Sequence, residues 1–344
     1  MFEKFIPVEV ILLAIETSCD DTAAAVLEGG RRVLSSLVSS QDEVHRKYGG
    51  VVPELASRRH MENIVPVVKG TLKEAGVDFD ELGGIAVTRG PGLIGSLFVG
   101  LSTAKAIAFA RGIPFVGVNH LMGHLLAIFL EREVPFPFIG MVVSGGHTSL
   151  FLVEDFLRFR SLGATRDDAA GEAFDKVAKA LGLGYPGGRI IEELATRGDP
   201  HAIAFPRPYL EGSFDFSFSG LKTAVINYIR SHRIGEDEVP HVAASFQEAV
   251  VDVLVKKALW ASARFGVGRV VVSGGVASNG RLRERFLEEG RKEGIEVLFP
   301  SPRFCTDNAA MIGVAGYHLL KAGRRDPLDL NATSRWPLGR EDGP

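Results

Sequence analysis

Two histidines, His120 and His124, stand four residues apart in the segment HLMGHLLAIFLE. In a helix this spacing puts both imidazoles on one face, about one turn apart. The segment follows the apolar run PFVGV, which we predict to be a strand, and open α/β sheets bind ligands beyond the carboxyl ends of their strands. The pair is therefore a candidate metal site, although two core histidines with ordinary hydrogen bonds would show the same spacing.

A third possible ligand, Asp307, lies in FCTDNAAMIG at the start of a predicted helix. The alternative role there is capping, with Thr306 or Asp307 as the N-cap residue. Two imidazoles and one carboxylate would leave coordination positions open for a substrate, which suits Lewis-acid chemistry on a phosphate or carbonyl oxygen. A zinc peptidase with the H-E-x-x-H motif needs a glutamate beside the first histidine, and Leu121 occupies that position.

Three glycine-rich turns each follow an apolar run and could hold an anionic ligand. They are residues 89–93 (RGPGL), 143–148 (VSGGHT) and 273–279 (SGGVASN). Glycine lets backbone N–H groups approach phosphate oxygens, and a following helix N-terminus adds positive potential. Three such turns favour a nucleotide over plain tight turns. The sequence has no P-loop motif, so it does not belong to that nucleotide-binding class.

Carboxylates recur near these turns. Glu16, Asp20 and Asp21 line the first polar turn, and Glu172 and Asp175 lie in AAGEAFDKVAKALGL. They could contact a ligand or a proton in transfer. The alternatives are Asx-turn hydrogen bonding for the first group and a solvated helix face for the second.

The predicted elements repeat along the chain. Strand, polar turn and strand occur at 11–28 and again at 137–155, and strand, glycine turn and helix occur at 83–101 and again at 268–286. This duplication predicts an α/β protein of two lobes with a ligand in the cleft between them. We assign residues 1–136 and 309–344 to an N-terminal lobe with the metal-ligand helix. Residues 137–308 form the C-terminal lobe, with a helical insertion at about 165–260.

Composition sets further limits. The chain has 344 residues, a net charge of −3 and 46% hydrophobic residues, so it can form two cores and has no global basic character. A nucleic-acid partner would need a local basic patch. The only two cysteines, Cys19 and Cys305, cannot form a dense disulfide framework, and the short apolar run near the N-terminus suits one strand. We therefore expect a cytoplasmic protein without a membrane segment.

The motifs together closely resemble one protein family. They are ETSCDDTAAAV, HRKYGGVVPELASRRH, TRGPGLIGSLFVGL, NHLMGHLLA, VSGGHTSL, GEAFDKVAKALGLGYPGG, FSFSGLKTAV, SGGVASN and CTDNAAMIG. This set resembles the bacterial TsaD family of tRNA threonylcarbamoyladenosine synthases, formerly labelled O-sialoglycoprotein endopeptidases, over about residues 10–340. The resemblance implies the fold of the actin, hexokinase and Hsp70 ATPases. It also implies transfer of a threonylcarbamoyl group from threonylcarbamoyl-AMP to N6 of adenosine 37, in tRNAs that read codons beginning with adenosine.

The resemblance also implies site residues. The family's metal ligands fall on His120, His124 and Asp307, and it suggests Fe²⁺ over Zn²⁺ as the single divalent metal. Its substrate-binding positions fall on Val143, Ser144, Gly145, Gly146, His147, Asp175, Gly188, Glu192 and Asn279. At position 192 many relatives carry aspartate, which makes a role for Glu192 less secure.

Further expectations concern the base, the RNA and the partners. We expect no strong general base, and Asp20 is the candidate if one is needed. Basic residues around GGVVPELASRRH are candidates for tRNA phosphate contacts, or else form a solvated helix face: Arg46, Lys47, Arg58, Arg59 and His60. The resemblance implies two protein partners, a TsaB-like paralogue and a TsaE-like ATPase. The competing interpretations are a small-molecule kinase or ATPase of the same fold and a metallopeptidase.

Overall fold

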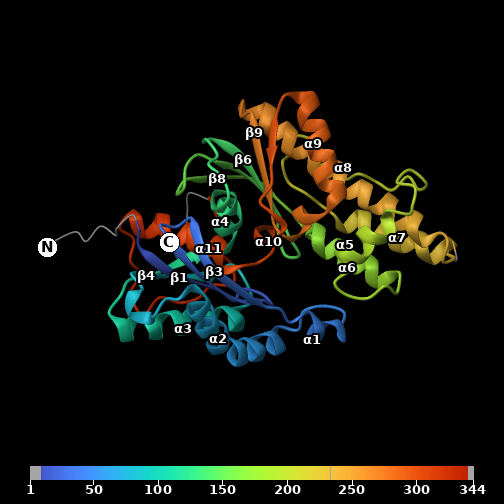
Figure 1. Ribbon diagram of the computed structural model, residues 1–344. Coiled ribbons are helices and arrows are strands. Elements are labelled where there is room, and N and C mark those ends of the chain that lie inside the picture. Colours follow the sequence, from blue (N-terminus) through green and yellow to red (C-terminus); the bar gives the residue numbers. More distant parts are fainter. Residues whose placement is uncertain (1–8, 233, 340–344) are drawn as a thin grey trace.

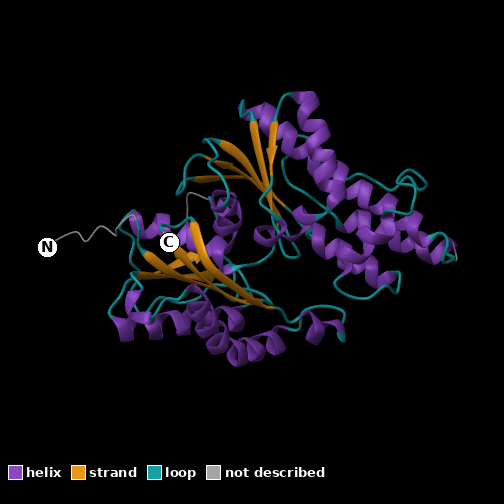
Figure 2. Ribbon diagram, viewed as in Figure 1, coloured by secondary structure: helices purple, strands orange, loops and turns teal. Residues whose placement is uncertain are grey.

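The computed structural model describes residues 9–232 and 234–339 (Figure 1). Two separate five-stranded sheets form the two halves of the molecule, and Figure 2 shows helices packed around both. Residues 1–8, 233 and 340–344, which include the outer ends of the predicted N-terminal lobe, lie outside the described residues.

The first sheet has the strand order β3-β2-β1-β4-β5. Its strands are β1 (Ile11–Glu16), β2 (Thr22–Glu28), β3 (Arg32–Ser39), β4 (Gly84–Gly90) and β5 (Phe115–Asn119). Strand β1 pairs antiparallel with β2 and parallel with β4, and β4 pairs parallel with β5. The central strands are buried on both faces, which explains why their sequences are continuously apolar.

The second sheet repeats this arrangement, with the order β8-β7-β6-β9-β10 when read in the same direction. Its strands are β6 (Phe138–Val143), β7 (Thr148–Val153), β8 (Phe159–Ala164), β9 (Arg269–Ser273) and β10 (Glu296–Leu298). Strand β6 pairs antiparallel with β7 and parallel with β9, as β1 does with β2 and β4. The predicted duplication of an α/β unit is thus confirmed.

Helices cover the two faces of the first sheet: α2 (Pro53–Ala75), α3 (Ile94–Arg111), α4 (His120–Leu126) and α11 (Ala309–Lys321). The short helix α1 (Asp42–Arg46) lies in the connection between β3 and α2. Along β1, Leu13 and Ile15 pack into one cluster with α2 and α3, whereas Leu12 and Ala14 pack into another with α4 and α11. This alternation follows the two-residue period of a strand.

Helices α4 and α11 lie between the two sheets. The apolar cluster that holds them also contains Phe138, Val142 and Val153 from the second sheet. In Figure 1, α11 accordingly lies beside the strands of the first sheet although it follows the second in sequence. The segments that carry the predicted metal ligands therefore belong to the layer shared by both halves.

The second half contains helices α5 (Ala170–Ala180), α6 (Gly187–Ala195), α7 (Ser219–His232), α8 (Val239–Phe265), α9 (Gly280–Glu293) and α10 (Pro302–Cys305). Helix α8 packs on β6 and β9 and α9 packs on β10, whereas α7 packs on α5 and α8. Most of the predicted helical insertion is α5 to α8. The exact lobe boundaries stay a prediction.

One helix, α3, is long and apolar enough to cross a membrane by length and composition, and no other helix in the described ranges meets both conditions. A third of the tested α3 segment is buried in the fold, with 33% of its residues inside. Core helices of proteins that never enter a membrane pass the same test, so this feature is weak evidence.

Candidate metal site and interlobe pocket

Helix α4 begins at His120 because Asn119 caps it. The Asn119 side chain accepts hydrogen bonds from the backbone N–H groups of Leu121, at 2.9 Å, and Met122, at 3.4 Å. An N-cap asparagine satisfies donors that the first helical turn leaves free. The cap fixes His120 at the carboxyl end of β5, with His124 one turn later on the same face.

The structure brings the three predicted ligands together. Asp307 Oδ1 lies 3.5 Å from His120 Nε2 and 3.1 Å from His124 Nε2. One ligand atom from each residue falls within 4.8 Å of the others. The two histidines are buried and the Asp307 side chain is partly exposed, so the cluster opens on one side only. Two imidazole nitrogens and one carboxylate oxygen in this arrangement suit a divalent transition metal.

The predicted capping role of Thr306 or Asp307 is wrong. The N-cap of α11 is Asn308, whose side chain accepts from the backbone N–H of Met311 at 3.0 Å. Asp307 precedes the cap, so its carboxylate is free to face the two histidines. The sequence DN offered two capping residues, and propensity alone does not choose between them.

A buried glutamate, Glu16, orients His120. The Oε2 atom of Glu16 lies 2.9 Å from His120 Nδ1 and accepts from the Thr88 hydroxyl at 2.6 Å. When Nδ1 of His120 carries the proton, its N–H donates to this carboxylate. Nε2 then has a free lone pair, on the side of the ring that faces Asp307. Carboxylates commonly hold metal-binding histidines in this way. Sequence reasoning placed Glu16 near the site but missed this contact, whose signal was a charged residue ending an apolar strand.

The acid–base properties of the cluster fit a cation site. Burial opposes protonation of His120, but Asp307 and Glu16 outweigh it and raise its pKa to about 9. Although burial works against ionisation of Asp307, the neighbouring histidines hold the pKa of its carboxyl below the usual range. Burial lowers the pKa of His124 below its ordinary value. The cluster therefore carries negative charge that a proton on His120 compensates, and a metal ion could replace that proton.

A cavity of about 740 Å³ opens beside the cluster, between the two halves. Its lining comes from residues 18–20, 49–51, 91–93, 120, 144–147, 172, 175, 176, 179, 185, 275 and 306–307. The structure thus brings eight predicted site residues to one cavity: Asp20, His120, Ser144, Gly145, Gly146, His147, Asp175 and Asp307. His124 lies behind this wall, fully buried. Tyr185 and Lys179 also line the cavity, and sequence reasoning had not selected them.

The turn after β6 exposes its backbone to the cavity. Ser144 N–H donates to His147 O at 2.7 Å, and the Ser144 hydroxyl accepts from His147 N–H at 3.1 Å, which closes the turn. A Cβ placed on Gly145 or Gly146 would meet no atom within 4 Å. The space beside these two glycines is therefore open to a ligand.

The turn reaches the metal ligands, since the rings of His147 and His120 are 6.2 Å apart between centroids. Burial, reinforced by the charges of His120 and His124, lowers the pKa of His147 to about 4. Its imidazole is thus neutral at neutral pH, and it can donate or accept a hydrogen bond beside the cavity.

The turn after β9 is held close to the end of β6 and the glycine turn that follows it. Gly274 has φ 96°, and a Cβ there would lie 2.3 Å from Val143 O. Only glycine fits this left-handed position without displacing β6. Gly275 then lines the cavity at its edge.

Carboxyl groups around the cavity resist ionisation. Asp175 lines the cavity from α5, in the same half as the glycine turn, and Asp20 lines it from the opposite wall, with Asp21 next to it in the same turn. Burial raises the pKa of Asp21 to about 8 and that of Asp175 to about 6, and it also raises the pKa of Asp20. Asp307 adds to the shift at both Asp20 and Asp21. This wall would favour a cation or a hydrogen-bond donor, such as an amine, over a second anion.

Four predicted substrate contacts do not line the cavity: Val143, Gly188, Glu192 and Asn279. Asn279 is buried, caps α9 by accepting from Leu282 N–H, and donates to Gln247 Oε1 at 2.7 Å. Glu192 accepts from Gly280 N–H at 2.7 Å. These bonds tie α6 to the start of α9, and a direct substrate role for the four residues stays a prediction.

The predicted RNA-contact residues divide into two groups. Arg46, Lys47, Arg58 and Arg59 are exposed, although Arg58 pairs with Glu54 and Arg59 with Glu62. His60 is fully buried, with Thr22 Oγ1 at 2.8 Å and Cys19 O at 2.9 Å, so its prediction as a phosphate contact is wrong. It faces inward on α2 because Ala56, His60 and Ile64 share one helical face.

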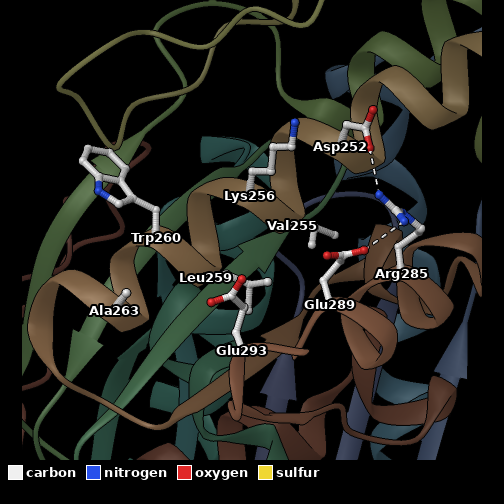
Figure 3. Close-up of a pocket in the computed structure, with 9 residues that line it drawn as sticks. All are labelled: Asp252, Val255, Lys256, Leu259, Trp260, Ala263, Arg285, Glu289 and Glu293. Carbon is white, nitrogen blue, oxygen red and sulfur yellow. Dashed lines mark hydrogen bonds and ion pairs between the residues drawn. The ribbon is translucent and has the colours of Figure 1, made fainter. Parts of the chain in front are cut away.

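A second groove lies between α8 and α9 (Figure 3). Val255 and Leu259 form its floor, and Figure 3 shows Arg285 between Asp252 and Glu289, which it pairs with at 3.3 Å and 3.1 Å. Three of its charged residues, Asp252, Arg285 and Glu289, are already paired with one another. It lacks the ligand set of the interlobe cavity and is not the catalytic candidate.

Comparisons with known proteins decide the family. The sequence model of the TsaD family, tRNA N6-adenosine threonylcarbamoyltransferase, matches residues 32–314. Proteins of that name from Syntrophus aciditrophicus and Geobacter metallireducens are 55% and 57% identical over 332 residues. The alignments cover 96% of this chain and 98% and 97% of those relatives. The chain belongs to the TsaD family.

Solved structures of distant proteins agree on the fold. HypF from T. kodakarensis superposes with a TM-score of 0.64 at 15% identity, covering 92% of this chain and 48% of that one. Component A of the Acidaminococcus fermentans (R)-2-hydroxyglutaryl-CoA dehydratase has a TM-score of 0.54 at 16% identity, covering 91% and 99%. These neighbours have the actin- and hexokinase-like ATPase fold, which confirms the fold class predicted for this TsaD-family chain.

Proposed function

We propose that this chain transfers the threonylcarbamoyl group of threonylcarbamoyl-AMP to N6 of adenosine 37 in tRNA, in tRNAs that read codons beginning with adenosine. The observation that carries this proposal is membership of the TsaD family over nearly the whole chain. The interlobe cavity supports it, because one wall suits an anionic adenylate and the other an amine.

The donor would lie against the turn after β6. The exposed backbone of Gly145 and Gly146 leaves room for phosphate oxygens to approach N–H groups. Transfer forms a bond between N6 and the carbamoyl carbon, breaks the bond from that carbon to the phosphate oxygen, and releases AMP and one N6 proton. The mixed anhydride is already activated, so positioning and charge stabilisation should supply most of the rate.

We propose that His120, His124 and Asp307 hold one divalent metal, with Fe²⁺ favoured over Zn²⁺. When bound, the ion supplies Lewis-acid stabilisation to the oxygens of the leaving phosphate. Glu16 holds His120 in the tautomer that leaves Nε2 free. His147 reaches the same region from the second half and can donate a hydrogen bond to the donor.

Asp20 is the group of this chain proposed to accept the N6 proton, if a base is used at all. It lines the cavity, and its raised pKa brings it closer to the range in which a carboxylate accepts protons well. A normal rate for Asp20→Asn would remove it from the mechanism.

The two competing functions gain no support. A peptidase would need a carboxylate at position 121, where Leu121 is buried in the apolar cluster between the sheets. Kinases that use hydrated magnesium do not need the two imidazoles found here. The test is to incubate the purified chain and its partner proteins with unmodified tRNA and threonylcarbamoyl-AMP, with sugar and glycoprotein controls. Threonylcarbamoyl incorporation into tRNA supports the proposal, and its absence would overturn it.

We further propose a cytoplasmic location and two protein partners, a TsaB-like paralogue and a TsaE-like ATPase. An apolar surface on α2 and α3 suits the paralogue. Large side chains are exposed there, at Met61, Val65, Phe98 and Phe109, the last with 75% exposure. Apolar surface shared by two neighbouring helices is typical of helix–helix association.

This interface has a direct test. The double variant F98D/F109D should lose association with the paralogue in analytical ultracentrifugation, because two charges would be buried at the contact. The matched control is Leu287→Asp, which changes an exposed apolar residue of α9 with 40% exposure. Unchanged association of the double variant would show that the partner binds elsewhere.

A further inference from the structure

A basic groove lies between α5 and α7, beside the interlobe cavity. Its volume is about 330 Å³. Lys176, Lys179 and Ala180 come from one face of α5, and Lys222, Ile226, Ile229 and Arg230 come from one face of α7. The groove therefore presents four cationic side chains around an aliphatic floor, on a protein whose net charge is −3.

A buried carboxylate fixes two of these cations. Asp168 is 9% exposed, and its carboxylate lies 2.8 Å from Lys176 Nζ and 2.6 Å from Lys222 Nζ. Glu172 lies 2.8 Å from Lys176 as well. An ammonium group has three donors, so both lysines keep at least one for a ligand while their positions are set in advance. Such ordering reduces the entropy lost on binding.

The other two cations are free to bind an external anion. Lys179 and Arg230 are exposed, and among the residues that the structure describes neither forms an ion pair. The groove thus has a net positive charge after Asp168 and Glu172 are counted. This differs from the predicted RNA contacts on α2, where Arg58 and Arg59 each pair with a glutamate.

The groove continues into the cavity and towards the first half of the molecule. Lys176 and Lys179 line both the groove and the interlobe cavity. Across the cavity, Lys179 Nζ lies 3.4 Å from the position that a Cβ on Gly49 would take. The groove therefore reaches the segment 49–51 of the first half, which also lines the cavity.

We propose that the α5–α7 groove binds backbone phosphates of tRNA on either side of the nucleotide whose base enters the interlobe cavity. This inference rests on the proposed function, since it takes tRNA as the acceptor. Continuity with the reaction cavity favours RNA over an acidic protein, because a polynucleotide whose base reaches the cavity must run its phosphates over the rim. Phosphate contacts position a nucleic acid without reading its sequence.

The test is the affinity of the full chain, with its partner proteins, for unmodified tRNA as a function of salt and without donor substrate. The test variant is K179E/R230E, which changes only exposed side chains. The matched control is R264E/R291E, which changes two exposed basic residues of the same half that line neither the groove nor the cavity. Circular dichroism checks that both variants fold.

The proposal predicts that K179E/R230E binds tRNA at least tenfold more weakly near 0.1 M salt. The slope of log affinity against log salt should fall by about 1 to 2, as expected for two lost phosphate contacts. The control should keep the affinity and slope of the unchanged protein. Equal affinity and slope in K179E/R230E would overturn the groove proposal. Polyglutamate serves as an acidic polypeptide probe. If K179E/R230E lost binding to polyglutamate but kept its binding to tRNA, the groove would bind an acidic protein and the proposal would also be overturned.

Failure of this inference is distinguishable from failure of the proposed function. If the unchanged protein transfers threonylcarbamoyl to tRNA while K179E/R230E binds tRNA normally, only the groove assignment is wrong. If the unchanged protein with its partners binds no tRNA at all, both are wrong.

Discussion

Two turns in equivalent places of the duplicated fold have opposite chemistry. The turn between β1 and β2 carries Asp20 and Asp21, whose carboxyls are partly buried and have raised pKa values. The equivalent turn between β6 and β7 carries Gly145 and Gly146, which are exposed and surrounded by open space. One duplicated scaffold therefore supplies an acidic wall and an anion-binding wall to the same cavity.

The difference shows where the reaction machinery can arise in a duplicated protein. The strand order is common to both halves, but the turn residues are free to diverge because they face the cavity and not the core. The metal ligands come from neither turn. They come from α4 and from Asp307, which precedes the N-cap of α11, and both helices lie in the layer between the sheets. A metal ion held there would lie where the two walls meet.

The largest effect should come from Asp307→Asn, which weakens the cluster at this junction. We expect metal affinity and the transfer rate to fall at least a hundredfold, since an amide oxygen is a much weaker ligand than a carboxylate. Folding should persist because Asn308, not Asp307, caps α11. Metal content by mass spectrometry and single-turnover kinetics check this. Asn308→Ala is the contrast: it should lose about 1 kcal/mol of stability while keeping all three ligands.

A smaller effect should follow from Glu16→Gln. The amide can still hydrogen-bond but no longer balances charge on His120, so metal affinity should fall about 10- to 100-fold. Competition with a chelator of known affinity measures it. If the affinity is unchanged, Glu16 serves only the packing of β1.

The strands, the duplication and the three clustered ligands could be predicted from the sequence, because strand burial and helical spacing are local properties. The start of α4 at His120 is an example, since Asn119 is a strong N-cap residue. Sequence reasoning failed where tertiary contacts decide between equivalent local choices. His60 looked like part of a basic run but faces β2, and Thr306 or Asp307 looked like the cap of α11, which is Asn308.

The anion-binding wall can be tested separately with Gly146→Val. A Cβ at this position meets nothing within 4 Å, so the fold should tolerate the change while the added side chain obstructs the donor. We expect KM for threonylcarbamoyl-AMP to rise about tenfold. This corresponds to a loss of about 1.4 kcal/mol in the binding free energy of the donor. Gly268→Val is the matched control, because a Cβ there also meets nothing within 4 Å and Gly268 is remote from the cavity. Equal KM values for the two variants would remove the turn from donor binding.

The smallest effect concerns the acidic wall and appears as a pH dependence. In the folded metal-free protein the pKa of Asp21 is about 8, whereas an aspartate in the unfolded chain has the ordinary pKa of 3.8. The folded state therefore holds a proton that the unfolded state releases, and this contribution to stability is lost as pH rises from about 4 to about 8. Asp21→Asn should remove this loss of stability. The melting temperature of the variant minus that of the unchanged protein should therefore increase from pH 4 to pH 8, by about 2 °C or more at pH 8.

Thermal melts of metal-free protein at several pH values measure this difference, with exposed Asp237→Asn as the control. A difference that stays constant from pH 4 to pH 8 would show that Asp21 titrates normally and that the two turns are less unlike than the structure indicates.

The most direct test of the account is a metal titration of the full-length protein. Metal-free protein, supplied with tRNA, threonylcarbamoyl-AMP and its partner proteins, is loaded stepwise with Fe²⁺ while bound metal and transfer rate are recorded together. The account predicts that the rate rises in proportion to bound metal and saturates at one ion per chain, and that Asp307→Asn abolishes both. Full transfer by the metal-free protein, or saturation with the ion bound away from His120 and His124, would contradict it.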